Sequence, residues 1–176
     1  EQGEAAGRVV SGSAGGGTAV PANINAPDQV VISGDPASVK RAGERCKEMG
    51  AKRVMPLKVS GAFHSPLMQL ARRGLEEELA RVTFRDPRFP VVPNVSAQPV
   101  REAAAARRLL GEQLTAPVRW VDCMRAAAGT AGAGVTFLEI GPGAVLAGLL
   151  RRIVPEATAV SLGGADDVQR FLERAA

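Results

Sequence analysis

Residues 135–162 read VTFLEIGPGAVLAGLLRRIVPEATAVSL, and this stretch decides the fold class. The apolar run 135–140 predicts a buried parallel strand. The turn Gly141-Pro142-Gly143 follows, and residues 144–153 then show helical periodicity. A second strand at 157–162 and a helix at 166–175 complete the series. Strand, helix, strand, helix in succession predicts an α/β fold with a parallel sheet layer covered by helices.

The first 59 residues predict a smaller α+β subdomain, roughly Thr18–Val59. Strands at 18–25 and 29–33, joined by a turn at Ala26-Pro27-Asp28, predict a hairpin. A helix should begin at Pro36 with Asp35 as its N-cap and end near Gly50. Alternation over Lys52–Val59 predicts a third strand. Residues 1–17 predict the end of a helix followed by a flexible loop.

The middle of the chain predicts helices and one short strand. A helix should begin at Ser65-Pro66, and its i, i+4 apolar stripe should form a core face. That stripe comprises Leu67, Ala71, Leu75 and Leu79. Residues 89–95 predict a short buried strand, residues 101–114 a helix, and a further helix should begin near Pro117.

Composition narrows the classes of function. The 176 residues hold a single histidine, which excludes a multi-histidine metal site, and we expect no metal. Two separated cysteines fit no zinc spacing and indicate reduced thiols in a cytoplasmic protein. The sequence has no apolar stretch of ~18 residues and therefore predicts no membrane-spanning helix. The N-terminus does not resemble a signal peptide, and its lack of an initiator Met favours a processed chain or a gene fragment.

The net charge of +4 favours an acidic partner. Paired arginines at 72–73, 107–108 and 151–152 carry much of it, although each pair is also compatible with an ordinary solvated helix face. Nucleic acid is not expected, because no basic run is interleaved with aromatic residues.

The only histidine, His64, lies in the segment GAFHSPLM at residues 61–68. It falls on the turn between the predicted strand 52–59 and the helix that begins at Pro66. Loops at strand ends are where α/β proteins place functional groups, and a histidine there can act as a general base near neutral pH. Without further context, a lone histidine is more often a capping or core residue.

Four segments in order supply that context. Together they resemble the malonyl-CoA:acyl-carrier-protein transacylases and the acyltransferase domains of fatty-acid and polyketide synthases. The segments are NINAPDQVVISG at 23–34, GAFHSPLM at 61–68, QLTAPVRW at 113–120 and EIGPGAVL at 139–146. The resemblance runs from about Val20 to the C-terminal region.

This resemblance implies ping-pong malonyl transfer from malonyl-CoA to the phosphopantetheine thiol of acyl carrier protein through a seryl-malonyl intermediate. His64 would be the general base, and the backbone carbonyl of Gln113 would orient its ring. Phe63 and Asn25 would contact substrate. Malonyl-CoA and acyl carrier protein are the expected substrate and partner, and no cofactor is expected.

The chain lacks catalytic groups that the family pattern includes. The family's nucleophile lies in a G-H-S-x-G elbow, and none of the eight serines here has glycine at both −2 and +2. The oxyanion-hole segment and the malonate-binding arginine of the family would also precede this region. We therefore expect the C-terminal part of a malonyltransferase, inactive alone, with a missing N-terminal half as a further partner.

The resemblance also assigns residues 1–59 to an incomplete ferredoxin-like subdomain and residues 60–176 to part of the α/β-hydrolase-like acyltransferase domain. Two alternatives stay open. One is a non-catalytic module that binds carrier protein or CoA, and the other is a piece of a polyketide-synthase acyltransferase domain.

Overall fold

The computed structural model describes residues 16–175, so the helix end and loop predicted for residues 1–17 lie almost wholly outside the described residues. The chain divides into two compact units, Glu1–Cys123 and Met124–Ala176, and helix α5 (Trp120–Ala131) continues from the first into the second. The predicted division at residue 59 rests on family resemblance and stays a prediction.

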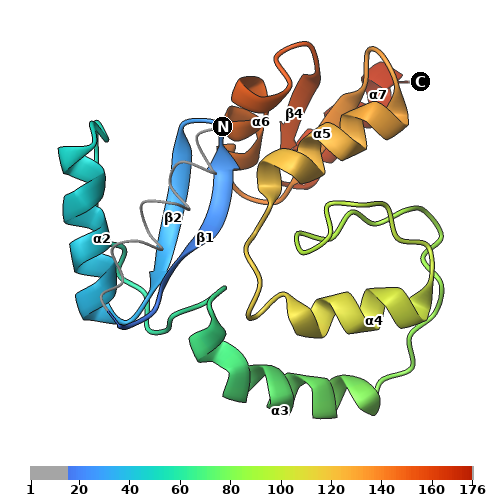
Figure 1. The fold of residues 1–176 in the computed structure, drawn as a ribbon. Helices are drawn as coiled ribbons and strands as arrows, with labels where there is room; N and C mark the ends of the chain where they lie inside the picture. Colours follow the sequence, from blue (N-terminus) through green and yellow to red (C-terminus); the bar gives the residue numbers. More distant parts are fainter. Residues whose placement is uncertain (1–15, 176) are drawn as a thin grey trace. The chain divides into compact units, whose positions relative to one another are not determined.

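Among the residues that the structure describes, the first element of the first unit is the predicted hairpin (Figure 1). Strand β1 (Ala19–Ala26) pairs antiparallel with β2 (Gln29–Gly34). Helix α2 (Pro36–Glu48) packs against both strands, where the buried Ala19 and Ala42 form a small core with the partly buried Ile32 packed against it. The predicted hairpin and helix are therefore confirmed.

Asp35 ties the start of α2 to the start of the hairpin. Its carboxylate accepts hydrogen bonds from the backbone N–H of Ser38 at 2.9 Å and of Thr18 at 2.6 Å. The predicted N-cap is thus confirmed, and the same side chain also holds Thr18, the residue just before β1. The two backbone bonds, that from Ser38 first, lower the pKa of the Asp35 carboxyl.

The predicted third strand at Lys52–Val59 is wrong. Residues 52–59 form no strand, and Met55, Leu57 and Val59 are more than half exposed. A strand requires a hydrogen-bonded neighbour. No described segment pairs with these residues, so their alternating pattern has no sheet to join.

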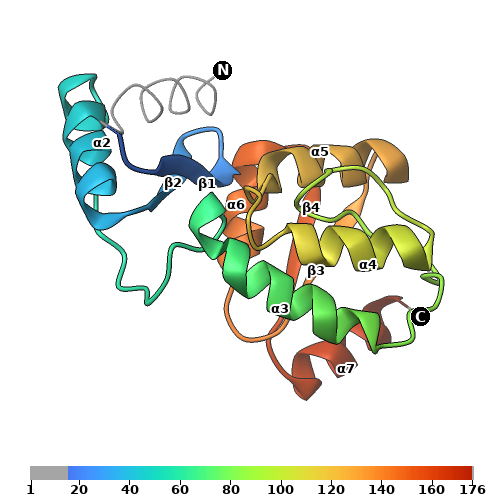
Figure 2. The same ribbon diagram turned by 60° about the horizontal axis from the view of Figure 1, so that its bottom comes forward.

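Two adjacent helices form the middle of the first unit. The short 3-10 helix η1 (Pro66–Met68) leads into α3 (Gln69–Ala80), and α3 lies beside α4 (Ala103–Glu112) (Figure 2). The predicted core face on α3 is wrong, because none of its residues is buried and Leu67 is 51% exposed. Leu75 and Leu79 are only half-buried, since α4 covers one side of the helix.

The buried strand predicted at Phe89–Val95 is also wrong. Phe89 is 72% exposed, and the segment contributes one isolated antiparallel bridge, between Val91 and Val100. Proline at 90 and 93 removes backbone donors that a ladder would need.

Helix α5 begins at Trp120, three positions later than the predicted start near Pro117. The reason is that the backbone of Val118 is hydrogen-bonded to strand β1. The N–H of Val118 donates to Ala22 O at 2.8 Å, and the N–H of Ile24 donates to Val118 O at 2.8 Å. Residue 118 therefore continues the hairpin as a parallel bridge and cannot join the helix.

The second unit contains the predicted series of alternating strands and helices. Strands β3 (Thr136–Ile140) and β4 (Thr158–Leu162) are parallel neighbours, with α6 (Val145–Ile153) between them in sequence and α7 (Ala165–Ala175) after them. Leu149, Leu150 and Ile153 on α6 are buried. The predicted α/β class and parallel pairing are confirmed.

Strand β3 is not buried as predicted. Its residues alternate between exposed and half-buried, and Ile140 is 76% exposed. Within residues 16–175, the sheet of β3 and β4 has only these two strands, so one edge and much of one face of β3 lack a neighbour.

None of the helices found between residues 16 and 175 is long and apolar enough to cross a membrane.

Candidate functional site

His64 lies in a strained turn just before η1. Its φ of 60° is in the left-handed region, which a residue with a side chain adopts at a cost of about 1–2 kcal/mol. The backbone N–H of His64 donates to Leu114 O at 3.0 Å, a contact that holds this conformation. Strain of this kind at a candidate catalytic residue is an observation that favours a functional constraint.

The neighbouring serine fixes the same turn. The fully buried hydroxyl of Ser65 donates to Ala62 O at 2.7 Å and accepts from the N–H of Leu67 at 3.3 Å. Ser65 is thus the N-cap of η1. Since its hydroxyl is buried and its proton is committed to a carbonyl, Ser65 cannot serve as the nucleophile.

The imidazole of His64 is held by two backbone carbonyls. Its Nδ1 lies 2.9 Å from Gln113 O and 3.1 Å from Ala116 O. Both partners are acceptors only, so Nδ1 must carry the proton and donate it. In the neutral ring the lone pair is therefore on Nε2, which is the atom that can accept a proton.

The sequence explains why these two carbonyls are available. Gln113 is the C-cap of α4, and the last carbonyls of a helix have no partner within the helix. Ala116 precedes Pro117, and the residue before a proline is disfavoured in the helical conformation. The chain therefore turns between α4 and Val118, and the turn presents both oxygens to one nitrogen.

The structure brings together only some of the predicted site residues. His64 and the carbonyl of Gln113 are in direct contact, as the resemblance implies. Phe63 is 43% exposed and is not a core residue. Asn25 lies half-buried on β1, next to the Ile24 that binds Val118, and no hydrogen bond within residues 16–175 joins it to His64. The substrate contacts of Phe63 and Asn25 stay predictions.

Two contributors were missed by the sequence interpretation: the carbonyls of Ala116 and Leu114. The Ala116-Pro117 dipeptide was a usable signal, because a pre-proline carbonyl after a helix is free to accept. Nothing in the sequence marks Leu114, since any residue type supplies the same backbone oxygen.

Neither cysteine offers an alternative nucleophile. Burial raises the pKa of both the Cys46 and the Cys123 thiols, which keeps them protonated and unreactive. The Cys123 thiol lies 3.6 Å from Pro93 O and 3.8 Å from the Asn94 side-chain oxygen.

The first unit also has a hollow of about 450 Å³ at the other end of α3 and α4. It is lined by residues 80–84 with Ala103, Ala104 and Arg107, and none of the predicted site residues belongs to it. The candidate site is therefore the His64 turn and not this hollow.

Comparison with known proteins defines the class. Residues 11–173 match the acyl transferase domain family, and the chain belongs to that family. Its curated relatives include the malonyl CoA-acyl carrier protein transacylase of Salmonella typhimurium, which is 46% identical over 151 residues, 85% of this chain and 48% of the relative. The transacylase of the same name from Escherichia coli O157:H7 is 42% identical over 95% of this chain and 53% of its own length. The predicted resemblance to this family is confirmed.

Solved structures of malonyl-transacylases also match this chain. The complex of PlMCAT with AntF, a type II PKS acyl-carrier protein with its malonyl-transacylase, matches with a TM-score of 0.92 and 38% identity over 99% of this chain and 56% of that one. An acyl carrier protein S-malonyltransferase from Vibrio cholerae matches with a TM-score of 0.91 and 36% identity, over 97% of this chain and 55% of that one. The chain spans about half the length of the curated relatives it matches.

Proposed function

We propose that this chain serves malonyl transfer from malonyl-CoA to the phosphopantetheine thiol of acyl carrier protein, with His64 as the general base. The observation that carries the proposal is the pair of carbonyls at Nδ1 of His64, 2.9 Å and 3.1 Å away. They fix the tautomer whose Nε2 can accept a proton. The names of the relatives supply the reaction.

Each half of the proposed reaction uses Nε2 once as base and once as acid. A serine hydroxyl attacks the malonyl thioester carbonyl and gives its proton to Nε2. The C–S bond then breaks, and Nε2 returns the proton to the CoA thiolate. The carrier-protein thiol next attacks the seryl ester and gives its proton to Nε2, which passes it to the serine oxygen as the C–O bond breaks.

The carbonyls take the place that a carboxylate has in a Ser-His-Asp triad. Gln113 is at the C-terminal end of α4, and the partial negative charge at a helix C-terminus is the sign that favours a transient imidazolium. The end of α4 thus supplies both orientation and charge.

The proposal requires a serine from outside these 176 residues, since no serine here lies in a G-H-S-x-G elbow. We propose, again from the family resemblance, that residues 1–59 are part of a ferredoxin-like subdomain and that residues 60–176 complete the acyltransferase domain. The reaction needs no resident cofactor, and we assign it to the cytoplasm.

The deciding experiment joins this chain to the serine-bearing half of the Escherichia coli relative and measures transfer of labelled malonyl groups to acyl carrier protein. We expect transfer in the joined protein, and none from this chain alone. Replacing His64 with Ala should lower the rate by ~10²–10⁴-fold, the usual contribution of a general base. An unchanged rate in His64→Ala would refute the role of His64.

The alternative is a module that binds the acidic carrier protein without chemistry, which the net charge of +4 favours. Salt-sensitive binding of carrier protein to this chain, together with no transfer by the joined protein, would support that alternative instead.

A further inference from the structure

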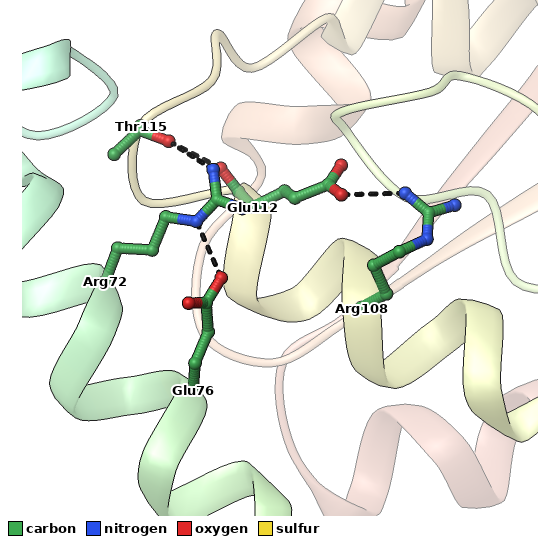
Figure 3. Close-up of polar contacts among 5 residues, drawn as sticks. All are labelled: Arg72, Glu76, Arg108, Glu112 and Thr115. Atoms are coloured by element: carbon green, nitrogen blue, oxygen red, sulfur yellow. Dashed lines mark hydrogen bonds and ion pairs between the residues drawn. The ribbon is translucent and has the colours of Figure 1, made fainter.

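Figure 3 shows an arginine of α3 that reaches into the turn after α4. The Nη1 of Arg72 donates to the hydroxyl oxygen of Thr115 at 3.1 Å, and the Thr115 hydroxyl donates to Glu112 O at 3.2 Å. Thr115 lies between the two residues, Gln113 and Ala116, whose carbonyls hold His64. Arg72 therefore contacts the turn that orients the imidazole.

The guanidinium of Arg72 is fixed from its other side. Its Nε donates to Glu76 Oε1 at 2.7 Å, one helical turn further along α3. The Arg72 side chain is 27% exposed, whereas that of Arg108, which pairs with Glu112 on α4, is 61% exposed (Figure 3). The more buried arginine is thus the one that reaches the His64-binding turn.

Gly111 makes room for this arrangement. A Cβ at position 111 would lie 3.0 Å from Cγ of Glu76, closer than side chains ordinarily approach. The glycine on α4 therefore lets Glu76 lie against that helix while it holds Arg72.

We propose that Arg72 is a positioning residue for His64 and acts through Thr115. Thr115 joins Arg72 on α3 to Glu112 O at the end of α4. This link keeps the carbonyl oxygens of Gln113 and Ala116 at the spacing that the Nδ1–H of His64 requires. Without Arg72 or the Thr115 hydroxyl, the turn loosens and Nδ1 loses its second acceptor. The role of this turn in catalysis rests on the function proposed above, whereas its effect on the ring is measurable in this chain alone.

The experiment uses the single histidine. In the full chain labelled with ¹⁵N-histidine, both ring-nitrogen signals belong to His64 and report its tautomer directly. The measurement is made at a pH where the ring is neutral, on the wild type, Arg72→Ala and Thr115→Val. The matched controls are Arg108→Ala, which removes an ion pair of α4 without touching Thr115, and Thr115→Ser, which keeps the hydroxyl.

In the wild type we expect the proton on Nδ1. In Arg72→Ala and Thr115→Val the ratio of tautomers should move toward Nε2–H by roughly two- to tenfold, the range that one lost hydrogen bond allows. Arg108→Ala and Thr115→Ser should leave it unchanged. Should Arg72→Ala unfold the chain, the nearly isosteric Thr115→Val decides alone.

An unchanged ratio in folded Arg72→Ala, an unchanged ratio in Thr115→Val, or an equal shift in Arg108→Ala would overturn the positioning role. A wild-type ring with its proton on Nε2 would instead contradict the proposed function, because Nε2 could not then act as the base. The two failures are therefore distinguishable.

Discussion

His64 and Gln113 are 49 positions apart in sequence, yet Nδ1 of His64 lies 2.9 Å from the carbonyl oxygen of Gln113. The contact joins a strained turn before η1 to the end of α4. It satisfies a helix-end carbonyl and fixes the imidazole tautomer at the same time. One hydrogen bond thus serves both the fold of the first unit and the proposed chemistry.

The turn of His64 depends on the Ser65 hydroxyl. Ser65 is fully buried, and replacing it with Ala removes the hydrogen-bond partner of Ala62 O and of the Leu67 N–H. We expect a loss of about 1–3 kcal/mol in the free energy of unfolding, measured by urea denaturation. The exposed Ser60→Ala is the matched control and should change little. Equal stability of the two variants would show that the Ser65 hydrogen bonds do not hold the turn.

Asp35 should make stability depend on pH. Hydrogen bonds from Ser38 and Thr18 lower the pKa of its carboxyl in the folded chain. Its stabilising contribution is therefore complete above the unfolded pKa of about 3.9 and is lost as the pH falls through the lower folded value. Asp35→Asn should melt at a lower temperature than the wild type near neutral pH, and the difference should shrink on acidification.

Thermal melts at a series of pH values test this. Glu44→Gln on the exposed face of α2 removes a carboxylate without a described hydrogen bond and serves as the control. A gap between Asp35→Asn and the wild type that stayed constant down to low pH would contradict the assignment.

Glu139 connects the two strands of the second unit to α6. Its carboxylate accepts from the N–H of Ala147 at 2.8 Å and of Leu146 at 3.0 Å, and Ser161 on β4 donates to it at 3.3 Å. These bonds, that from Ala147 first, lower the pKa of the Glu139 carboxyl. We expect Glu139→Gln to lower the melting temperature at neutral pH, because the helix N-terminus loses a negative charge.

The exposed Glu156→Gln is the matched control for Glu139→Gln. Differential scanning calorimetry should show a lower melting temperature for the Glu139 variant only. If both variants melt together, the contact with α6 contributes nothing measurable.

Phe63 should select malonyl over methylmalonyl substrates in the protein joined to its serine-bearing half. Phe63 is 43% exposed and directly precedes His64, and a phenyl group next to the bound acyl chain would leave no room for a branching methyl. Phe63→Ser should narrow the malonyl preference in kcat/KM by ~10–200-fold, mainly through a gain for methylmalonyl. Phe89→Ser, at another exposed ring, should keep the wild-type ratio. A ratio unchanged by Phe63→Ser would remove Phe63 from the specificity site.

The isolated chain should self-associate. Leu138 is 41% and Ile140 76% exposed on β3, whose outer edge has no partner strand within residues 16–175. Unpaired apolar edges associate readily. Sedimentation velocity should show mass rising with concentration, and Ile140→Lys should suppress it. Leu70→Lys, at a residue 82% exposed on α3, is the control. A monomer at all concentrations would contradict the expectation.

The sequence predicted those elements whose partners are close in the chain. The hairpin of β1 and β2 and the parallel pair of β3 and β4 followed from local pattern and short connections. The strands predicted from the sequence at Lys52–Val59 and Phe89–Val95 were wrong. Alternation and apolarity suggested strands there, but no described neighbour completes a ladder. A strand is defined by its partner, which periodicity cannot reveal.

By itself the sequence determined the identity of the candidate base, since His64 is the only histidine and lies in a recognisable motif. It also determined the class, because side-chain patterns in four segments match one family. Only the tertiary structure decided which atoms hold the ring. The carbonyls of Gln113 and Ala116, and the support of Arg72 through Thr115, depend on how the end of α4 meets the His64 turn. The reason is physical: a backbone oxygen is common to every residue, so only its position in space gives it a role.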